Sequence, residues 1–146
     1  MTTMPGSSFA GAAPAFSSEG LALEASLRDD VTTLSVGIGE RNLGRNPAQL
    51  EAAAVWVEAQ LLDAGYAVTP EPFQVNGHAV RNLIADLPGT VAPTELIVIG
   101  AHYDSAEGTP GADDNASGVA VGLALARRLH DTPQPRTVRF VFFTNE

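Results

Sequence analysis

Cysteine is absent from the sequence, so neither disulfide bonds nor thiolate metal ligands are possible. This absence suits a reducing compartment and, with no signal peptide recognised, favours a cytoplasmic location. Basic residues are scarce: 8 Lys and Arg stand against 17 Asp and Glu, which gives a formal net charge of −9. Because no basic surface is available to neutralise phosphates, we expect no nucleic-acid partner. No apolar run approaches the length of a transmembrane helix, so we expect no membrane partner.

The composition is that of one globular domain. At 146 residues, with 45% apolar and 17% charged residues, the chain is long enough to bury a core. Residues 1–20 are rich in Ser, Thr, Ala, Gly and Pro, and they lack the cationic start and apolar middle of a signal peptide. We predict a disordered tail over 1–20 and a folded unit over 21–146. An incomplete start of the sequence is the alternative explanation of the tail.

Two helices are predicted in the first half of the folded unit. Apolar residues recur at helical spacing over 21–34, and the glycine-rich stretch 36–44 is predicted to be a loop. The second helix begins at the Asn-Pro pair of residues 46–47, with Asn as the cap and Pro at the first helical position. Gln49 stands where a capping box requires it. Gly65 is expected to end this helix.

A β-hairpin is predicted next. Residues 67–75 and 79–87 have the composition of strands, and the Asn-Gly pair between them at 76–77 is typical of a tight hairpin turn. Two prolines in the first strand indicate that it lies at an edge of the sheet. His78, beside the turn, is expected to be a solvated loop residue.

The remaining sequence alternates strand, helix and strand. We predict a short buried strand over 95–100, a helix that is apolar on most sides over 117–130, and an interior strand over 137–144. This order predicts an α/β fold, the amino-terminal part of a three-layer αβα sandwich with a mixed, mainly parallel central sheet. The sequence stops after a central strand, which leaves one sheet face without cover, so we expect it to be truncated there.

His102 and Asp104 follow the predicted strand 95–100, at the carboxyl end where open α/β sheets bind ligands. Residues two apart in a strand point to the same side. The carboxylate of Asp104 can therefore accept the second N–H of the imidazole, as metal-bound histidines require. A structural role for His102 is the alternative.

An acidic cluster, Asp-Asp-Asn at residues 113–115, opens the predicted helix 117–130. Such residues cap free N–H groups at helix N-termini, which is one explanation of the cluster. In the other, the intervening loop folds the cluster back onto His102, and imidazole plus carboxylate form a site for zinc or a similar divalent metal. Glu146, at the end of the last strand, is either a solvated residue or a general base that faces the same cleft.

Three segments together resemble successive motifs of the di-zinc aminopeptidases of metallopeptidase family 28. Members include bacterial leucyl aminopeptidase, glutamate carboxypeptidase II and glutaminyl cyclase. The segments are Ala-His-Tyr-Asp-Ser at 101–105, Gly-Ala-Asp-Asp-Asn-Ala-Ser-Gly at 111–118, and Arg-Thr-Val-Arg-Phe-Val-Phe-Phe-Thr-Asn-Glu at 136–146. The resemblance covers about residues 80–146, and the order and spacing of the three motifs make it specific.

The resemblance implies an activity and a role for each motif residue. The family removes N-terminal residues from peptides with a free N-terminus and uses two zinc ions. The resemblance makes His102 a ligand of one zinc and Asp104 the catalytic-site carboxylate that orients it. By the same resemblance, Asp114 is expected to bridge both ions and to precede a cis peptide bond. Glu146 is the general base that deprotonates the attacking water. The family's further ligands, a second glutamate and later Asp and His residues, fall beyond residue 146.

Other functions are open at this point. A glutaminyl cyclase-like acyl transferase shares the fold, although Asp-Asn-Ala-Ser-Gly at 114–118 is more similar to the peptidases. A catalytically inactive interaction domain is the non-enzymatic alternative, and the truncated chain alone is expected to be inactive. A nucleotide-binding domain is disfavoured because no glycine-rich phosphate loop follows a strand. Manganese or cobalt is the alternative to zinc. Substrate side-chain preference and oligomeric state are not determined by the sequence.

Overall fold

The computed structural model describes residue 11 and residues 15–144 of the chain. Most of the tail predicted over 1–20, and the candidate base Glu146, therefore lie outside the described residues. The elements, in chain order, are α1 (Ser18–Thr32), η1 (Thr33–Ile38), α2 (Pro47–Asp63), β1 (Val68–Val75), β2 (His78–Leu87), β3 (Ala92–His102), η2 (Ala112–Ala116), α3 (Ser117–Leu129) and β4 (Arg136–Phe143). None of the described helices is long and apolar enough to cross a membrane.

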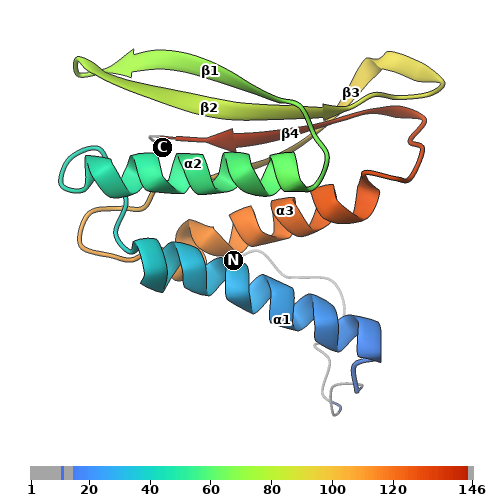
Figure 1. The fold of residues 1–146 in the computed structure, drawn as a ribbon, viewed down its shortest axis with the longest axis horizontal. Coiled ribbons are helices and arrows are strands. Elements are labelled where there is room, and N and C mark those ends of the chain that lie inside the picture. Colours follow the sequence, from blue (N-terminus) through green and yellow to red (C-terminus); the bar gives the residue numbers. More distant parts are fainter. Residues whose placement is uncertain (1–10, 12–14, 145–146) are drawn as a thin grey trace, which may run out of the picture.

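The strands form one mixed sheet in the order β1-β2-β4-β3 (Figure 1). β1 pairs with β2, and β2 with β4, in antiparallel orientation, whereas β3 and β4 are parallel. α3 connects β3 to β4, because parallel neighbours need a crossover connection. The predicted α/β class with a mixed sheet is confirmed. The pairings among the described strands are mainly antiparallel rather than mainly parallel, because the hairpin supplies half of the strands.

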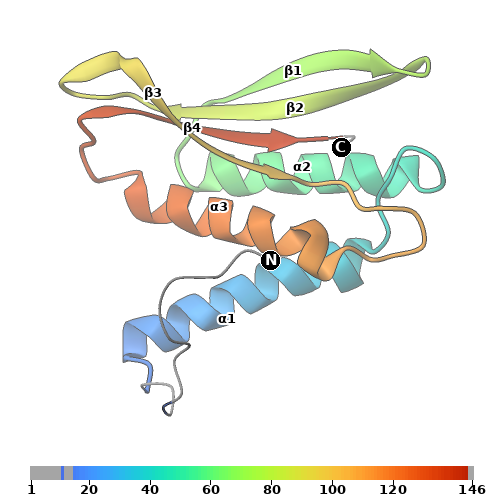
Figure 2. The ribbon, with the colours of Figure 1, turned by 180° about the vertical axis from the view of Figure 1, so that it is seen from behind.

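The helices lie on one side of the sheet. α2 and α3 pack side by side against one face, and α1 packs on α3 on the side away from the sheet (Figures 1 and 2). The core between the sheet and these two helices is apolar and almost fully buried, and includes Leu61, Leu83, Leu123, Phe140 and Phe142. Within residues 15–144 no helix covers the opposite face of the sheet. The described residues therefore form two of the three predicted layers, the sheet and the helices on one side of it.

The first helical segment is longer than predicted at both ends. α1 begins at Ser18, inside the expected tail, because the Ser17 hydroxyl caps it by accepting a backbone N–H of the first turn at 3.1 Å. At its other end the chain continues into η1, where the loop over 36–44 was predicted. Leu34 is fully buried and holds this segment against the core. Gly39, with a φ of 84°, ends η1.

The start of α2 is confirmed in position but not in its capping contacts. Pro47 occupies the first helical position as expected. Asn46 makes no side-chain capping bond, and its N–H donates to the carbonyl of Asn42 at 3.1 Å, so the predicted capping box with Gln49 is not formed. Asn42 Oδ1 in turn accepts a hydrogen bond from Arg45 N at 2.8 Å. The turn before α2 is therefore stabilised by Asn42.

Gly65 ends α2 as predicted, with a φ of 92°. A Cβ at this position would lie 2.6 Å from His130 Nε2. Because other residues rarely adopt this φ, we expect Gly65→Ala to lower the free energy of unfolding by about 1–3 kcal/mol in urea denaturation. Gly37→Ala is the control, since a Cβ there has its nearest neighbour 4.0 Å away and the backbone is helical. Equal losses in the two variants would contradict this explanation.

The predicted hairpin is confirmed. Asn76 and Gly77 have φ values of 50° and 83°, as a tight hairpin turn requires. β1, with its prolines, lies at the edge of the sheet as predicted. His78 is the first residue of β2 and pairs with Val75, so its predicted place in a loop is wrong, because the turn needs only two residues. Its side chain is exposed, as expected.

The strand predicted over 95–100 is longer and more exposed than expected. The side chains of residues 96–98 are 47% to 57% exposed, because β3 lies at the edge of the described sheet and the helices cover only one face. β4 is an interior strand, as predicted, with Phe140 and Phe142 buried against the helices. Strand burial therefore depends here on sheet order, which local composition does not determine.

Candidate metal centre

The predicted metal-binding side chains gather where β3 ends. β3 terminates at His102, and a loop over residues 103–111 leads into η2 and α3. A cleft of about 290 Å³ opens between this loop and the turn before α2. It is lined by Asn42, Leu43, Gly44, His102, Asp104, Ser105, Ala106, Glu107 and Asp114. One imidazole and three carboxylates therefore share the cleft.

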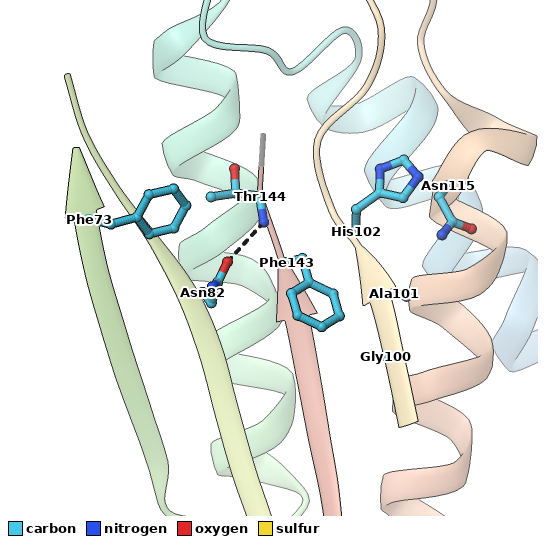
Figure 3. Close-up of a pocket in the computed structure, with 8 residues that line it drawn as sticks. All are labelled: Phe73, Asn82, Gly100, Ala101, His102, Asn115, Phe143 and Thr144. Atoms are coloured by element: carbon cyan, nitrogen blue, oxygen red, sulfur yellow. Dashed lines mark hydrogen bonds between the residues drawn. The ribbon is translucent and has the colours of Figure 1, made fainter. Parts of the chain in front are cut away.

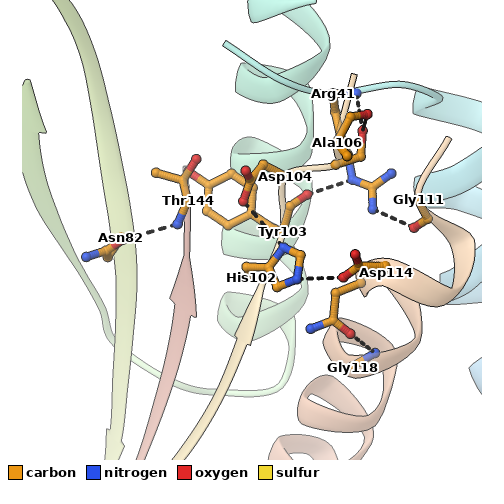
Figure 4. A network of polar contacts seen from close by, with 12 residues as sticks. Arg41, Asn82, His102, Tyr103, Asp104, Ala106, Gly111, Asp114, Gly118 and Thr144 are labelled. Atoms are coloured by element: carbon orange, nitrogen blue, oxygen red, sulfur yellow. Dashed lines mark hydrogen bonds and ion pairs between the residues drawn. The ribbon is translucent and has the colours of Figure 1, made fainter. Parts of the chain in front are cut away.

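His102 lies between two carboxylates. Its Nε2 is 2.9 Å from Asp114 Oδ1, and its Nδ1 is 3.5 Å from Asp104 Oδ1 (Figure 4). Asp104 is buried, whereas 75% of the Asp114 side chain is exposed. The structure therefore brings together three of the predicted site residues. One imidazole nitrogen faces the protein interior, and the other faces a carboxylate that is open to solvent.

Asn115 makes the capping contact at the start of α3. Its Oδ1 accepts a hydrogen bond from Gly118 N at 2.9 Å, and a Cβ on Gly118 would lie 2.3 Å from that oxygen. The Asp114–Asn115 peptide bond is cis, as the resemblance implies. The carboxylate of Asp114 contacts His102. Helix capping therefore explains Asn115 but leaves Asp114 available for the cleft.

The donors at this position suit zinc. Imidazole nitrogen and carboxylate oxygen are common zinc ligands. Asp104 faces the second imidazole nitrogen, as the orienting partner of a metal-bound histidine does. Among the described residues no group of three or more His, Cys, Asp or Glu side chains is arranged to hold a metal. His102 and Asp114 thus supply two donors, and a four-coordinate site needs further ligands.

Arg41 belongs to the site but was not identified from the sequence. It is fully buried, and its guanidinium donates to the carbonyl oxygens of Tyr103 at 2.6 Å and Gly111 at 2.9 Å (Figure 4). Burial lowers the pKa of Arg41, and the charge of Asp104 acts in the opposite direction. In the sequence, an arginine within a glycine-rich stretch has no feature that indicates burial. Its role is visible only in the packed structure.

A second hollow, of about 510 Å³, borders His102 and the ends of the strands (Figure 3). Its lining consists of Phe73, Asn82, Gly100, Ala101, His102, Asn115, Phe143 and Thr144. Asn82 Oδ1 accepts a hydrogen bond from Thr144 N at 3.2 Å, which holds the end of β4 against β2. Glu146, two residues further on, lies outside the described residues. Its predicted position at the cleft therefore stays a prediction.

Comparison with known proteins identifies the family. The model of peptidase family M28 matches residues 82–146, a segment that includes His102, Asp104, Asp114 and Glu146. This segment belongs to peptidase family M28. The family resemblance inferred from the three sequence motifs is confirmed.

Curated relatives match the chain over part of their own length. YfbL, an uncharacterized protein of Escherichia coli K12, is 38% identical over 109 residues, which are 69% of this chain and 33% of YfbL. Aminopeptidase YwaD of Bacillus subtilis is 39% identical over 59 residues, which are 40% of this chain and 13% of YwaD. The chain thus spans about a third or less of the length of these two relatives.

Several solved structures share the fold of this chain. The zinc aminopeptidase BSAP from Bacillus subtilis superposes with a TM-score of 0.75 at 13% sequence identity, over 82% of this chain and 61% of BSAP. At this identity the likeness shows the fold alone. Glutaminyl cyclases are also among the similar solved structures.

Proposed function

We propose that this chain is part of a zinc-dependent aminopeptidase that hydrolyses N-terminal peptide bonds. The observation that carries the proposal is the approach of His102 Nε2 to Asp114 Oδ1 at 2.9 Å inside the M28 segment, with Asp104 behind the imidazole. The sequence relative YwaD, which is named an aminopeptidase, supports the reaction. The fold shared with a zinc aminopeptidase supports the metal.

Each site residue has a distinct role in this proposal. His102 and Asp114 would hold zinc, with Asp114 serving two ions as the family resemblance implies, and further ligands would complete the coordination. Asp104 Oδ1 faces His102 Nδ1 at 3.5 Å and would orient the ring, which leaves Nε2 as the metal donor. Zinc held there would supply Lewis-acid chemistry, polarising the substrate carbonyl and making bound water more acidic. Glu146 takes the proton of the attacking water and passes it to the leaving amine.

The acidic charge of the chain favours a substrate with a free N-terminus. Asp104, Glu107 and Asp114 line the cleft, and the chain as a whole carries a formal net charge of −9. Arg45 neutralises part of this charge, since its Nε lies 2.9 Å from Glu107 Oε2. Bound zinc would offset the charges of Asp104 and Asp114, so the negative potential that attracts the ammonium group of a peptide is that of the chain as a whole. We therefore propose peptides with an unblocked N-terminus as the substrate class.

Acyl transfer of the glutaminyl cyclase kind is the second candidate, because solved glutaminyl cyclases share this fold. A peptide that begins with glutamine separates the two reactions. Hydrolysis releases free glutamine and a peptide shorter by one residue, whereas cyclisation releases ammonia and keeps the peptide at full length. Zinc binding without turnover of any such peptide would instead support the inactive interaction domain.

Removal of zinc tests the proposal in the complete gene product that contains this sequence. We expect the purified protein to hold zinc by elemental analysis and to cleave an aminoacyl-p-nitroanilide. Dialysis against a chelator should reduce kcat to background, because no side chain of the cleft can replace zinc as a Lewis acid. Added zinc should restore kcat. Dialysis against zinc-saturated chelator is the control. Full activity after zinc removal, or no bound zinc, would overturn the proposal.

A further inference from the structure

Arg41 is the most completely buried charged side chain among the described residues. It lies in the loop between η1 and α2, and its guanidinium donates to backbone carbonyl oxygens from two separate segments. The acceptors are Tyr103 O at 2.6 Å, Pro110 O at 2.6 Å, Gly111 O at 2.9 Å, Gly39 O at 3.2 Å and Leu34 O at 3.3 Å. A buried charge is costly unless its hydrogen bonds are satisfied, so these carbonyls must stay in place around it.

The contacts of Arg41 join the two ends of the loop that carries the metal site (Figure 4). Its Nε bonds to the carbonyl of Tyr103, the residue directly after His102. Its Nη2 bonds to the carbonyl of Gly111, three residues before Asp114. The guanidinium is planar and rigid, and it therefore sets the distance between these two carbonyls.

The loop fits closely around this side chain. Arg41 N donates to Ser105 Oγ at 3.1 Å, and the carbonyl of Arg41 accepts from Ser105 N at 2.9 Å. Gly111 has a φ of 57°, and a Cβ there would lie 2.5 Å from Asp114 O and 3.3 Å from Arg41 Nη2. The backbone of Arg41 thus holds the start of the loop, and its side chain holds both ends.

We propose that Arg41 is a positioning residue of the metal centre, which fixes the separation of His102 and Asp114 by holding both ends of the loop between them. This inference rests on the proposed zinc site. Lysine carries its charge on one nitrogen and cannot span the two carbonyls, so it cannot replace Arg41. A residue that contributed only to stability would change the melting temperature but not the properties of bound metal.

The test compares Arg41→Lys with Arg127→Lys in the complete gene product. Arg127 is a matched control, because it donates to Asp30 Oδ2 at 2.6 Å and Gln60 Oε1 at 2.7 Å, near the end of α3 that lies away from the metal site. We expect Arg41→Lys to weaken zinc binding about 10- to 100-fold in chelator competition, and to alter the visible absorption spectrum of the cobalt-substituted protein. Arg127→Lys should lower the melting temperature and leave both metal properties unchanged.

A second variant keeps the test decisive if Arg41→Lys does not fold. Ser105→Ala removes the hydroxyl that accepts the Arg41 N–H but keeps the side chain of Arg41, and it should weaken zinc binding about 2- to 10-fold. Wild-type zinc affinity and an unchanged cobalt spectrum in the folded variants would overturn the inference and leave the proposed function intact. A wild-type protein that binds no zinc would overturn both.

Discussion

The variant Asp114→Ala is expected to lose kcat/KM at least about 1,000-fold, equivalent to about 4 kcal/mol of transition-state stabilisation. Asp114 is the only carboxylate of the described residues that contacts His102 Nε2, at 2.9 Å, and in the proposed site it is shared by both zinc ions. Its removal therefore takes a ligand from each ion at once. The measurements are steady-state hydrolysis of an aminoacyl substrate and the zinc content of the dialysed protein, which should fall together.

The neighbouring residue provides a matched control for Asp114. Asp113→Asn removes one negative charge one position earlier in η2, so it changes the local charge by the same amount. We expect it to keep its zinc and most of its activity, because it is Asp114 that contacts His102. Equal losses in the two variants would show that local negative charge, rather than ligation by Asp114, maintains the site.

The second large effect is expected for Glu146→Gln, with a fall in kcat of about 100- to 10,000-fold and an unchanged zinc content. Glutamine has nearly the same shape as glutamate but cannot accept the proton of the attacking water. The reaction should therefore slow at its chemical step while substrate binding, reported by the inhibition constant of a peptide that is not cleaved, stays close to that of the wild type.

The zinc content separates this variant from Asp114→Ala, which should lose metal and activity together. A second comparison, Glu107→Gln, neutralises a carboxylate that lines the cleft and is paired with Arg45. Since Glu107 has no proposed part in proton transfer, kcat of this variant should stay near the wild-type value. Unchanged hydrolysis in Glu146→Gln would contradict the role of Glu146 as general base.

The sequence was sufficient to predict turns and helix ends where the backbone preference of one or two residues determines them. The Asn-Gly pair at 76–77 and Gly65 adopt positive φ values that few other residues tolerate, and Pro47 has the fixed φ of a first helical residue. These residues determine where the hairpin turns and where α2 begins and ends. The capping box at Gln49 failed because the N–H of Asn46 donates to Asn42, a contact made by the preceding loop.

The candidate site was predictable in its residue types but not in its assembly. Asp104 follows His102, the last residue of β3, by two positions, so their proximity followed from the alternation of side chains along an extended chain. For Asp114 the sequence allowed either helix capping or a contact with His102. The structure decides between them, because Asn115 makes the capping bond and the Asp114 carboxylate lies 2.9 Å from the imidazole.

The sequence by itself determined the α/β class, the hairpin, the limits of α2 and the resemblance of residues 82–146 to peptidase family M28, because these depend on local backbone preferences and on motif order. Only the tertiary structure decided that residues 96–98 are exposed and that Arg41 is buried. Both depend on which segments pack together: β3 lies at the edge of the described sheet, and a loop more than sixty positions away surrounds the guanidinium of Arg41. The burial of a residue depends on the segments that pack around it, and the type of residue alone does not determine it.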